Sequence, residues 1–183
     1  MRCCPGRWAV LAALALGAVG IAMAVVPGTL ANEDASTLTK VGDAVPAFTI
    51  ETTAGQKLTP ESLKGKVVLL NFFATWCGPC VGEMPHLQKL HEQFKDNDKF
   101  VMVSVGREHQ PDEVKQFAEK QKLTFPVAAD PKRETYGLFA KQYIPRNYVI
   151  DGEGKIIFQS VGFSEEEFKE MTKKIEKALE MAK

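Results

Sequence analysis

Two cysteines, Cys77 and Cys80, are separated in the sequence only by Gly78 and Pro79. They follow an almost continuous apolar run at 66–74, which is typical of a buried strand, and they precede apolar positions with helical spacing. A thiolate on Cys77 would face the free N–H groups and the positive dipole end of that helix, and these lower a thiol's pKa below its usual value of about 8.5. The placement predicts that Cys77 is an attacking nucleophile and that Cys80, one turn deeper, is the resolving thiol.

The residues around the pair suit this chemistry. Pro79 fits the first turn of a helix, where its missing N–H costs nothing. Gly78 removes side-chain bulk so that a partner chain can approach, and Trp76 supplies an apolar wall beside the outer sulfur. We therefore expect Trp76, Gly78 and Pro79 to belong to the site, and we expect its partners to be protein thiols and disulfides.

A metal site and inert packing are the alternatives for the pair. A structural zinc site needs four ligands. Beyond its first 31 residues the chain offers only these two cysteines and three scattered histidines, although two soft ligands could still hold a metal such as copper at a surface. Inert packing is disfavoured because an exposed corner between a loop and a helix is a poor place for a core residue. We expect no metal, and we interpret each histidine as a solvated residue: His86, His91 and His109.

The apolar pattern predicts the elements that hold the site. Strands and helices alternate along most of the chain, which indicates an α/β fold with a mixed central sheet covered by helices on both faces. A small hairpin is expected around Ala54 and Gly55, and Ser164 with Glu167 forms a capping signature that opens a last helix. The expected strands lie at 66–74, 100–106, 125–130, 143–151 and 155–162, and the expected helices begin near 79 and 112, pass through Tyr136 and Phe139, and follow Ser164.

The N-terminal segment differs in composition from the rest of the chain. Arg2 and Arg7 precede 19 uncharged, mostly apolar residues at 8–26, and small residues follow. The pattern is typical of an export signal cleaved after Ala31 or Ala24, but its length approaches that of an uncleaved membrane anchor. Both alternatives put the rest of the chain outside the cytoplasm, in the periplasm or an equivalent compartment. We divide the chain into a signal peptide or anchor at 1–31, a linker at 32–40 and one domain at 41–183.

Composition and charge exclude several classes of protein. The chain has 183 residues, of which 45% are hydrophobic and 25% charged, as in ordinary globular proteins. Its 23 basic and 23 acidic residues balance, so no basic field exists to attract nucleic acid. We expect contact with a membrane only through the N-terminal segment.

The motif "WCGPC", placed between an apolar strand and a helix, resembles the active site of thioredoxins. Pro85 resembles the proline inside their active-site helix, and Pro145 resembles the cis-proline that faces their sulfurs. Over residues 41–180 the chain resembles the exported TlpA/ResA-like thioredoxins, and the helix and strand at 111–130 are similar to their central insertion. The resemblance implies a thioredoxin fold, a redox-active Cys77–Cys80 disulfide with no other cofactor, and a membrane electron donor.

Three further positions bear on the chemistry. Thioredoxin keeps a buried carboxylate six residues before its first cysteine, whereas this chain has Asn71, which cannot titrate. Glu83 stands where ResA-like proteins carry a glutamate that tunes the cysteines, and a nearby negative charge raises the pKa of a thiol. The alternative is an acid that favours the first turn of a helix. Arg146 replaces the threonine common after the cis-proline, and it either contacts a partner or is solvated.

The direction of electron flow follows from the stability of the Cys77 thiolate. The Gly-Pro dipeptide is that of thioredoxin, a reductant near −270 mV, and Glu83 disfavours additional thiolate charge. We therefore predict a reductant of specific protein disulfides, with cytochrome c maturation as the job that the resemblance implies. An oxidase or isomerase of secreted proteins and a copper carrier that uses His86 remain alternatives. A peroxide-reducing enzyme is disfavoured, because Thr75 lies two residues before Cys77 and no proline precedes it as in peroxiredoxins.

Overall fold

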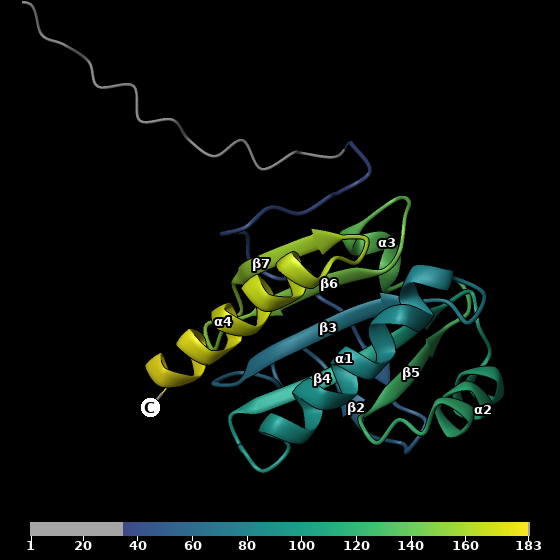
Figure 1. Cartoon of the computed structure of the whole chain (residues 1–183). Helices are drawn as coiled ribbons and strands as arrows, with labels where there is room; N and C mark the ends of the chain where they lie inside the picture. The colour runs from purple at the N-terminus through teal and green to yellow at the C-terminus, as the bar shows by residue number, and fades with distance from the viewer. Residues whose placement is uncertain (1–34, 183) are drawn as a thin grey trace, which may run out of the picture. The chain divides into compact units, whose positions relative to one another are not determined.

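The computed structural model describes residues 35–182, which form a five-stranded mixed sheet in the order β5-β4-β3-β6-β7 (Figure 1). β3 pairs in parallel with β4 and antiparallel with β6, while β4–β5 is parallel and β6–β7 antiparallel. The central strand β3 is buried along its whole length, as its apolar run predicts. The strands are β3 (Val67–Phe73), β4 (Phe100–Arg107), β5 (Val127–Asp130), β6 (Arg146–Ile150) and β7 (Ile156–Val161).

Three helices pack on one face of this sheet: α1 (Gly78–Phe94), α2 (Pro111–Gln121) and α4 (Glu165–Met181). Each turns its apolar positions inward, and the core between them includes Met84 and Leu87 of α1, Phe117 of α2, and Met171 and Ile175 of α4. α4 begins after Ser164, whose hydroxyl accepts a hydrogen bond from the N–H of Glu167, so the predicted cap is present.

The other face is covered by shorter pieces. The predicted hairpin is formed by β1 (Ile50–Glu51) and β2 (Lys57–Leu58), and the only helix in this second core is the single turn α3 (Tyr136–Phe139). Aromatic rings fill the space between these pieces and the sheet. The centre of the Phe72 ring on β3 lies 5.4 Å from the centre of the Tyr136 ring and 5.5 Å from that of Phe139. The predicted α/β fold is confirmed, but the two faces are covered unequally.

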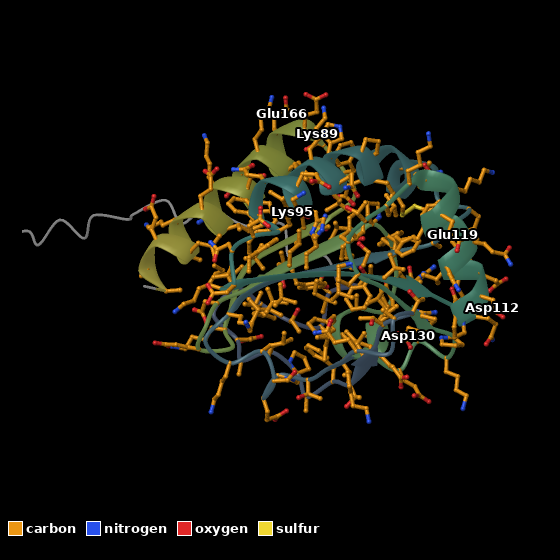
Figure 2. All side chains as sticks on the ribbon, turned by 90° about the horizontal axis from the view of Figure 1, so that it is seen from below. Lys89, Lys95, Asp112, Glu119, Asp130 and Glu166 are labelled. Carbon is orange, nitrogen blue, oxygen red and sulfur yellow. A yellow bond between two sulfur atoms is a disulfide. The ribbon has the colours of Figure 1, made fainter. Side chains whose placement is uncertain are left out.

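Charged side chains lie on the outer surfaces of the helices and on the loops. Lys89 on α1, Lys95 directly after α1, Asp112 and Glu119 on α2, and Glu166 on α4 are all exposed (Figure 2). Asp130, at the end of β5, is an exception, because it is buried and accepts hydrogen bonds from the backbone N–H groups of residues 134–136. This carboxylate fixes the turn that leads into α3.

The start of the folded part differs from the predicted boundary. The hydroxyl of Thr39 donates to Gln159, and Lys141 N–H donates to the carbonyl of Ser36 at 2.7 Å. Ser36 and Thr39 are buried. The described part of the predicted linker is therefore bound to the domain from Ser36 onward. The apolar run at 8–26 lies outside the described residues, and within residues 35–182 no helix is long and apolar enough to cross a membrane.

Candidate active site

The two cysteines lie where β3 ends and α1 begins, and they form a disulfide with a Cα–Cα distance of 5.2 Å. Cys77 is the N-cap of α1, and the backbone N–H of Cys80 points at its sulfur, with 3.2 Å between N and Sγ. This N–H is one of the groups that lack a partner inside the helix. In the reduced protein it would stabilise a thiolate on Cys77, which is the electrostatic effect that the sequence predicts.

The two sulfurs differ in access to solvent. Cys80 is completely buried, whereas Cys77 is 6% exposed and lies beside Trp76, of which 65% is exposed. A Cβ at Gly78 would meet no neighbouring atom within 4 Å, so the space beside this residue is open. The guanidinium carbon of Arg107 lies 5.8 Å from the centre of the Trp76 ring, which holds the indole by a cation–π contact.

Pro145 follows the residue whose carbonyl faces the outer sulfur. The Ile144–Pro145 peptide bond is cis, which is the geometry that the family resemblance implies. The carbonyl oxygen of Ile144 lies 3.8 Å from Cys77 Sγ, and the Pro145 carbonyl accepts a hydrogen bond from Gly162 N–H. We call Trp76, Cys77, Gly78 and the Ile144 carbonyl the rim of the site.

Glu83 lies on the inner side of the site, together with two asparagines. It is 1% exposed and receives hydrogen bonds from Asn147 Nδ2 at 2.6 Å and from Asn71 Nδ2 at 3.1 Å. Burial raises the pKa of Glu83 to about 7, although the two amide hydrogen bonds lower it. Since Glu83 is the sixth residue of α1 and fully buried, the alternative of a favourable acid in the first helical turn does not apply. We call Asn71, Glu83 and Asn147 the buried polar cluster.

Asn147 is a member of this cluster that the sequence analysis missed. It lies directly opposite Asn71 in the antiparallel register of β3 and β6, and the amide of Asn71 donates to its Oδ1 at 2.9 Å. Both asparagines interrupt strands that are otherwise largely apolar. An isolated polar residue in a buried strand is the signal for Asn71 in β3, whereas Asn147 directly follows Arg146 and is not isolated in β6.

His109 is a second residue that the sequence analysis missed, and the prediction that it is solvated is wrong. It is 6% exposed, and its Nε2 accepts a hydrogen bond of 3.0 Å from the backbone N–H of Thr75, two residues before Cys77. An acceptor Nε2 leaves the proton of the neutral ring on Nδ1, which lies 3.5 Å from a carboxylate oxygen of Glu113. A Cβ on Gly106 would come within 2.7 Å of Val114 Cγ2, so glycine there leaves room for α2 to pack against the strand.

The other two histidines are not simply solvated either. The ring of His86 lies 5.0 Å from Phe163 and 5.5 Å from Phe168, between α1 and the start of α4. His91 is half-buried against Phe125, and this burial lowers its pKa. Among residues 35–182, no three His, Cys, Asp or Glu side chains gather as a group that could hold a metal ion.

Arg146 contradicts both interpretations of its sequence position. Its side chain is fully buried, so it is neither solvated nor available to a partner. Its guanidinium donates hydrogen bonds to the Gln142 carbonyl at 2.8 and 3.0 Å, to the Tyr143 carbonyl at 3.2 Å, and to the hydroxyls of Ser36 and Thr37. Arg146 therefore joins the loop before the cis-proline to the N-terminal end of the described chain.

Comparison with known proteins places this geometry among thiol-disulfide enzymes. The Redoxin family model matches residues 40–179. The thiol-disulfide oxidoreductase ResA of Bacillus thuringiensis (strain Al Hakam) is 32% identical over 123 residues, covering 67% of this chain and 70% of ResA. The thioredoxin-like protein YneN of Bacillus subtilis (strain 168) is 35% identical over 136 residues, covering 74% of this chain and 78% of YneN.

A solved structure shows the same arrangement of elements. The solution structure of a protein from Bacteroides thetaiotaomicron, described as a protein disulfide isomerase, matches with a TM-score of 0.76 and 36% identity. The match covers 79% of this chain and 93% of that protein.

Proposed function

This chain belongs to the Redoxin family and is a thiol-disulfide oxidoreductase of the TlpA/ResA-like type, and on that premise we propose that it reduces specific protein disulfides outside the cytoplasm. The observation that carries the direction is the buried carboxylate of Glu83, which follows Cys80 on the same helix. When ionised, it opposes negative charge on the nearby sulfurs and so disfavours a strongly stabilised thiolate. A disulfide oxidant needs the opposite, because its reduced form must be unusually stable.

The reaction uses two electrons and needs no cofactor besides the cysteine pair. The Cys77 thiolate attacks one sulfur of the partner's disulfide, forms a mixed disulfide and releases a partner thiolate, which takes up a proton. Cys80 then loses its proton and attacks Cys77 Sγ, so that the second partner thiol leaves. The partner gains two electrons and two protons, and the Cys77–Cys80 disulfide forms.

Return to the dithiol requires two electrons and two protons from a donor. In an oxidising compartment, the glutathione and thioredoxin of the cytoplasm do not supply them, so a membrane electron carrier is the donor that we propose. The positive start and apolar run at 2–26 support export or tethering of the domain. The similarity to ResA supports apocytochrome c thiols, before haem attachment, as one candidate product.

Trapping of thiols in intact cells tests the direction. Cells that express the full chain are quenched with acid and treated with an alkylating reagent that adds mass to free thiols. A reductant is expected to show a large dithiol fraction at steady state, which collapses when the electron donor is lost. If Cys77 and Cys80 are almost wholly disulfide-bonded in normal cells, the chain is an oxidase instead.

The variant Cys80→Ser identifies the partners in the same cells. Because the resolving thiol is missing, Cys77 is expected to remain in mixed disulfides, which mass spectrometry of the purified adducts can assign. Cys77→Ser is the matched control, since the buried sulfur at Cys80 is expected to capture nothing. Equal capture by both variants would contradict the assigned roles.

A further inference from the structure

The loop that carries the cis-proline is held from two sides. On its N-terminal side, residues 36–38 pair with residues 139–141: Leu38 N–H donates to the Phe139 carbonyl at 2.9 Å, and Lys141 N–H donates to the Ser36 carbonyl at 2.7 Å. On its C-terminal side, Pro145 is bound to Gly162. Between these points, the chain from Gln142 to Ile144 reaches the rim of the site.

Arg146 is the link between the two sides. Its guanidinium bonds to the carbonyls of Gln142 and Tyr143 in the loop and to the hydroxyls of Ser36 and Thr37 in the N-terminal segment. Tyr143 has a φ of 67°, a backbone conformation that residues other than glycine rarely adopt. The buried fork of arginine donates to the Gln142 and Tyr143 carbonyls from one rigid plane, and the Tyr143 carbonyl also accepts a hydrogen bond from the hydroxyl of Tyr136 at 2.7 Å.

The position of this loop matters because its last carbonyl faces the reacting sulfur. Ile144 O lies 3.8 Å from Cys77 Sγ, and the side chain of Tyr143 next to it is 58% exposed. A protein that forms a mixed disulfide with Cys77 must pass between this loop and Trp76. A small disulfide reagent needs only the sulfur itself.

We propose that residues 36 and 37 form a strap that acts through Arg146 to hold the Gln142–Ile144 loop in position to receive a partner protein. Ser36, Thr37 and Arg146 are then positioning residues, and they set the affinity for protein disulfides rather than the chemistry of Cys77. This inference rests on the proposed function only in that the partner is a protein disulfide. It also gives the N-terminal segment a role in the site, in addition to any part in export or attachment.

The test compares a variant without the two hydroxyls that bond to Arg146 with a variant without a third hydroxyl of the same segment. The double variant Ser36→Ala, Thr37→Val removes both hydroxyl acceptors of Arg146, while Thr39→Val removes a hydroxyl of the same segment that bonds to Gln159 instead. The double variant Ser36→Thr, Thr37→Ser keeps both hydroxyls and is the conservative rescue. All are prepared in the full chain, and melting temperatures are measured to verify that each is folded.

Two measurements are made on each pre-reduced protein. The first is the second-order rate of reduction of insulin, a model protein disulfide, against that of 5,5′-dithiobis(2-nitrobenzoate), a small disulfide. We expect removal of both acceptors to slow insulin reduction about tenfold, through a higher KM, and to leave the small reagent unaffected. The control and the rescue variant should match the wild type on both substrates.

The second measurement is hydrogen exchange of the amides of residues 142–144, which does not depend on any activity. We expect about tenfold faster exchange there in the variant without both acceptors, and no change in the control. If hydrogen exchange at residues 142–144 is unchanged, or if the reduction of insulin and of the small reagent slows equally, the proposed strap is wrong. Failure of the wild type to reduce insulin, with normal reaction toward the small reagent, would count against the proposed function and leave the exchange result to decide on the strap.

Discussion

The two sulfurs of the site lie in regions that are built in different ways. Around Cys77, the rim consists of an exposed indole, an open glycine and a backbone carbonyl, and it is held from outside by Arg107 and by the loop before Pro145. The sulfur of Cys80 is fully buried, and the nearest ionisable group that follows it on the helix, Glu83, is buried and tied to two asparagine amides. We therefore propose that the rim selects the partners that reach Cys77 and that the buried polar cluster sets the charge near the sulfurs.

On this proposal, access and charge are controlled by separate parts of one small site. A change in the rim should alter reaction with a large partner while leaving stability and titration almost untouched. A change in the buried polar cluster should alter the pH dependence of stability and of thiol reactivity. Substitutions at Glu83, His109 and Trp76, ordered from the interior outward, test this separation.

The largest effect is expected for Glu83→Gln. Because burial raises the folded-state pKa of Glu83 from 4.5 to about 7, the folded protein holds a proton that the unfolded chain loses between these values. The free energy of unfolding of the wild type therefore falls as the pH rises through this window, by up to about 3 kcal/mol. Glutamine does not titrate, so the variant should gain that amount relative to the wild type between pH 4.5 and pH 8.

Denaturant unfolding of the oxidised proteins at several pH values measures this difference. Glu119→Gln is the control, because it makes the same change on the exposed face of α2 (Figure 2). Its stability curve should remain parallel to that of the wild type. If the curve of Glu83→Gln is also parallel, the pKa of Glu83 is the same in the folded and unfolded chains, and burial does not raise it.

An intermediate effect is expected for His109, which lies behind the rim. His109→Leu leaves the backbone N–H of Thr75 without its acceptor in a partly buried place, at a cost of up to about 2 kcal/mol in the free energy of unfolding. His109→Gln offers a carbonyl oxygen instead and should recover part of the loss. Alkylation of the reduced protein should also show slower reaction of Cys77 in the leucine variant, because Thr75 precedes the turn that places this sulfur.

His91→Leu is the matched control for this prediction. It removes a half-buried imidazole that lies against Phe125, so only packing changes. We expect the free energy of unfolding to fall by less than about 1 kcal/mol, and we expect no change in the reactivity of Cys77. Equal losses in the two leucine variants would mean that His109 contributes by packing and does not position the rim.

These contacts also show what the sequence could predict and what it could not. The strands, the helices and the position of the Cys77–Cys80 pair between a strand and a helix follow from local patterns, since apolar spacing and helix starts are visible over a few residues. The cis-proline and Glu83 were found through the family resemblance. The hairpin was found from alternation and a single turn signal.

The residues that were missed or misinterpreted depend on contacts between distant parts of the chain. Asn147 reaches Glu83 across 64 positions, and Arg146 reaches Ser36 across 110. No local pattern specifies such pairs, because they require the register of β3 and β6 and the path of the N-terminal segment. The position of His109 near Cys77 could have been predicted. His109 follows β4, which pairs in parallel with β3, and the carboxyl ends of parallel neighbours meet at one edge of the sheet.

The smallest effect on stability is expected at the outermost residue, Trp76. Because 65% of its surface is exposed, Trp76→Ala should change the free energy of unfolding by less than about 1 kcal/mol, most of it from the contact with Arg107. Reduction of insulin should nevertheless slow severalfold, whereas reaction with a small disulfide should not. Trp76→Phe, which keeps an apolar ring beside Cys77, should retain most of the rate. If alanine slows both substrates equally, the indole acts on the sulfur itself, and the division between access and charge does not extend to the rim.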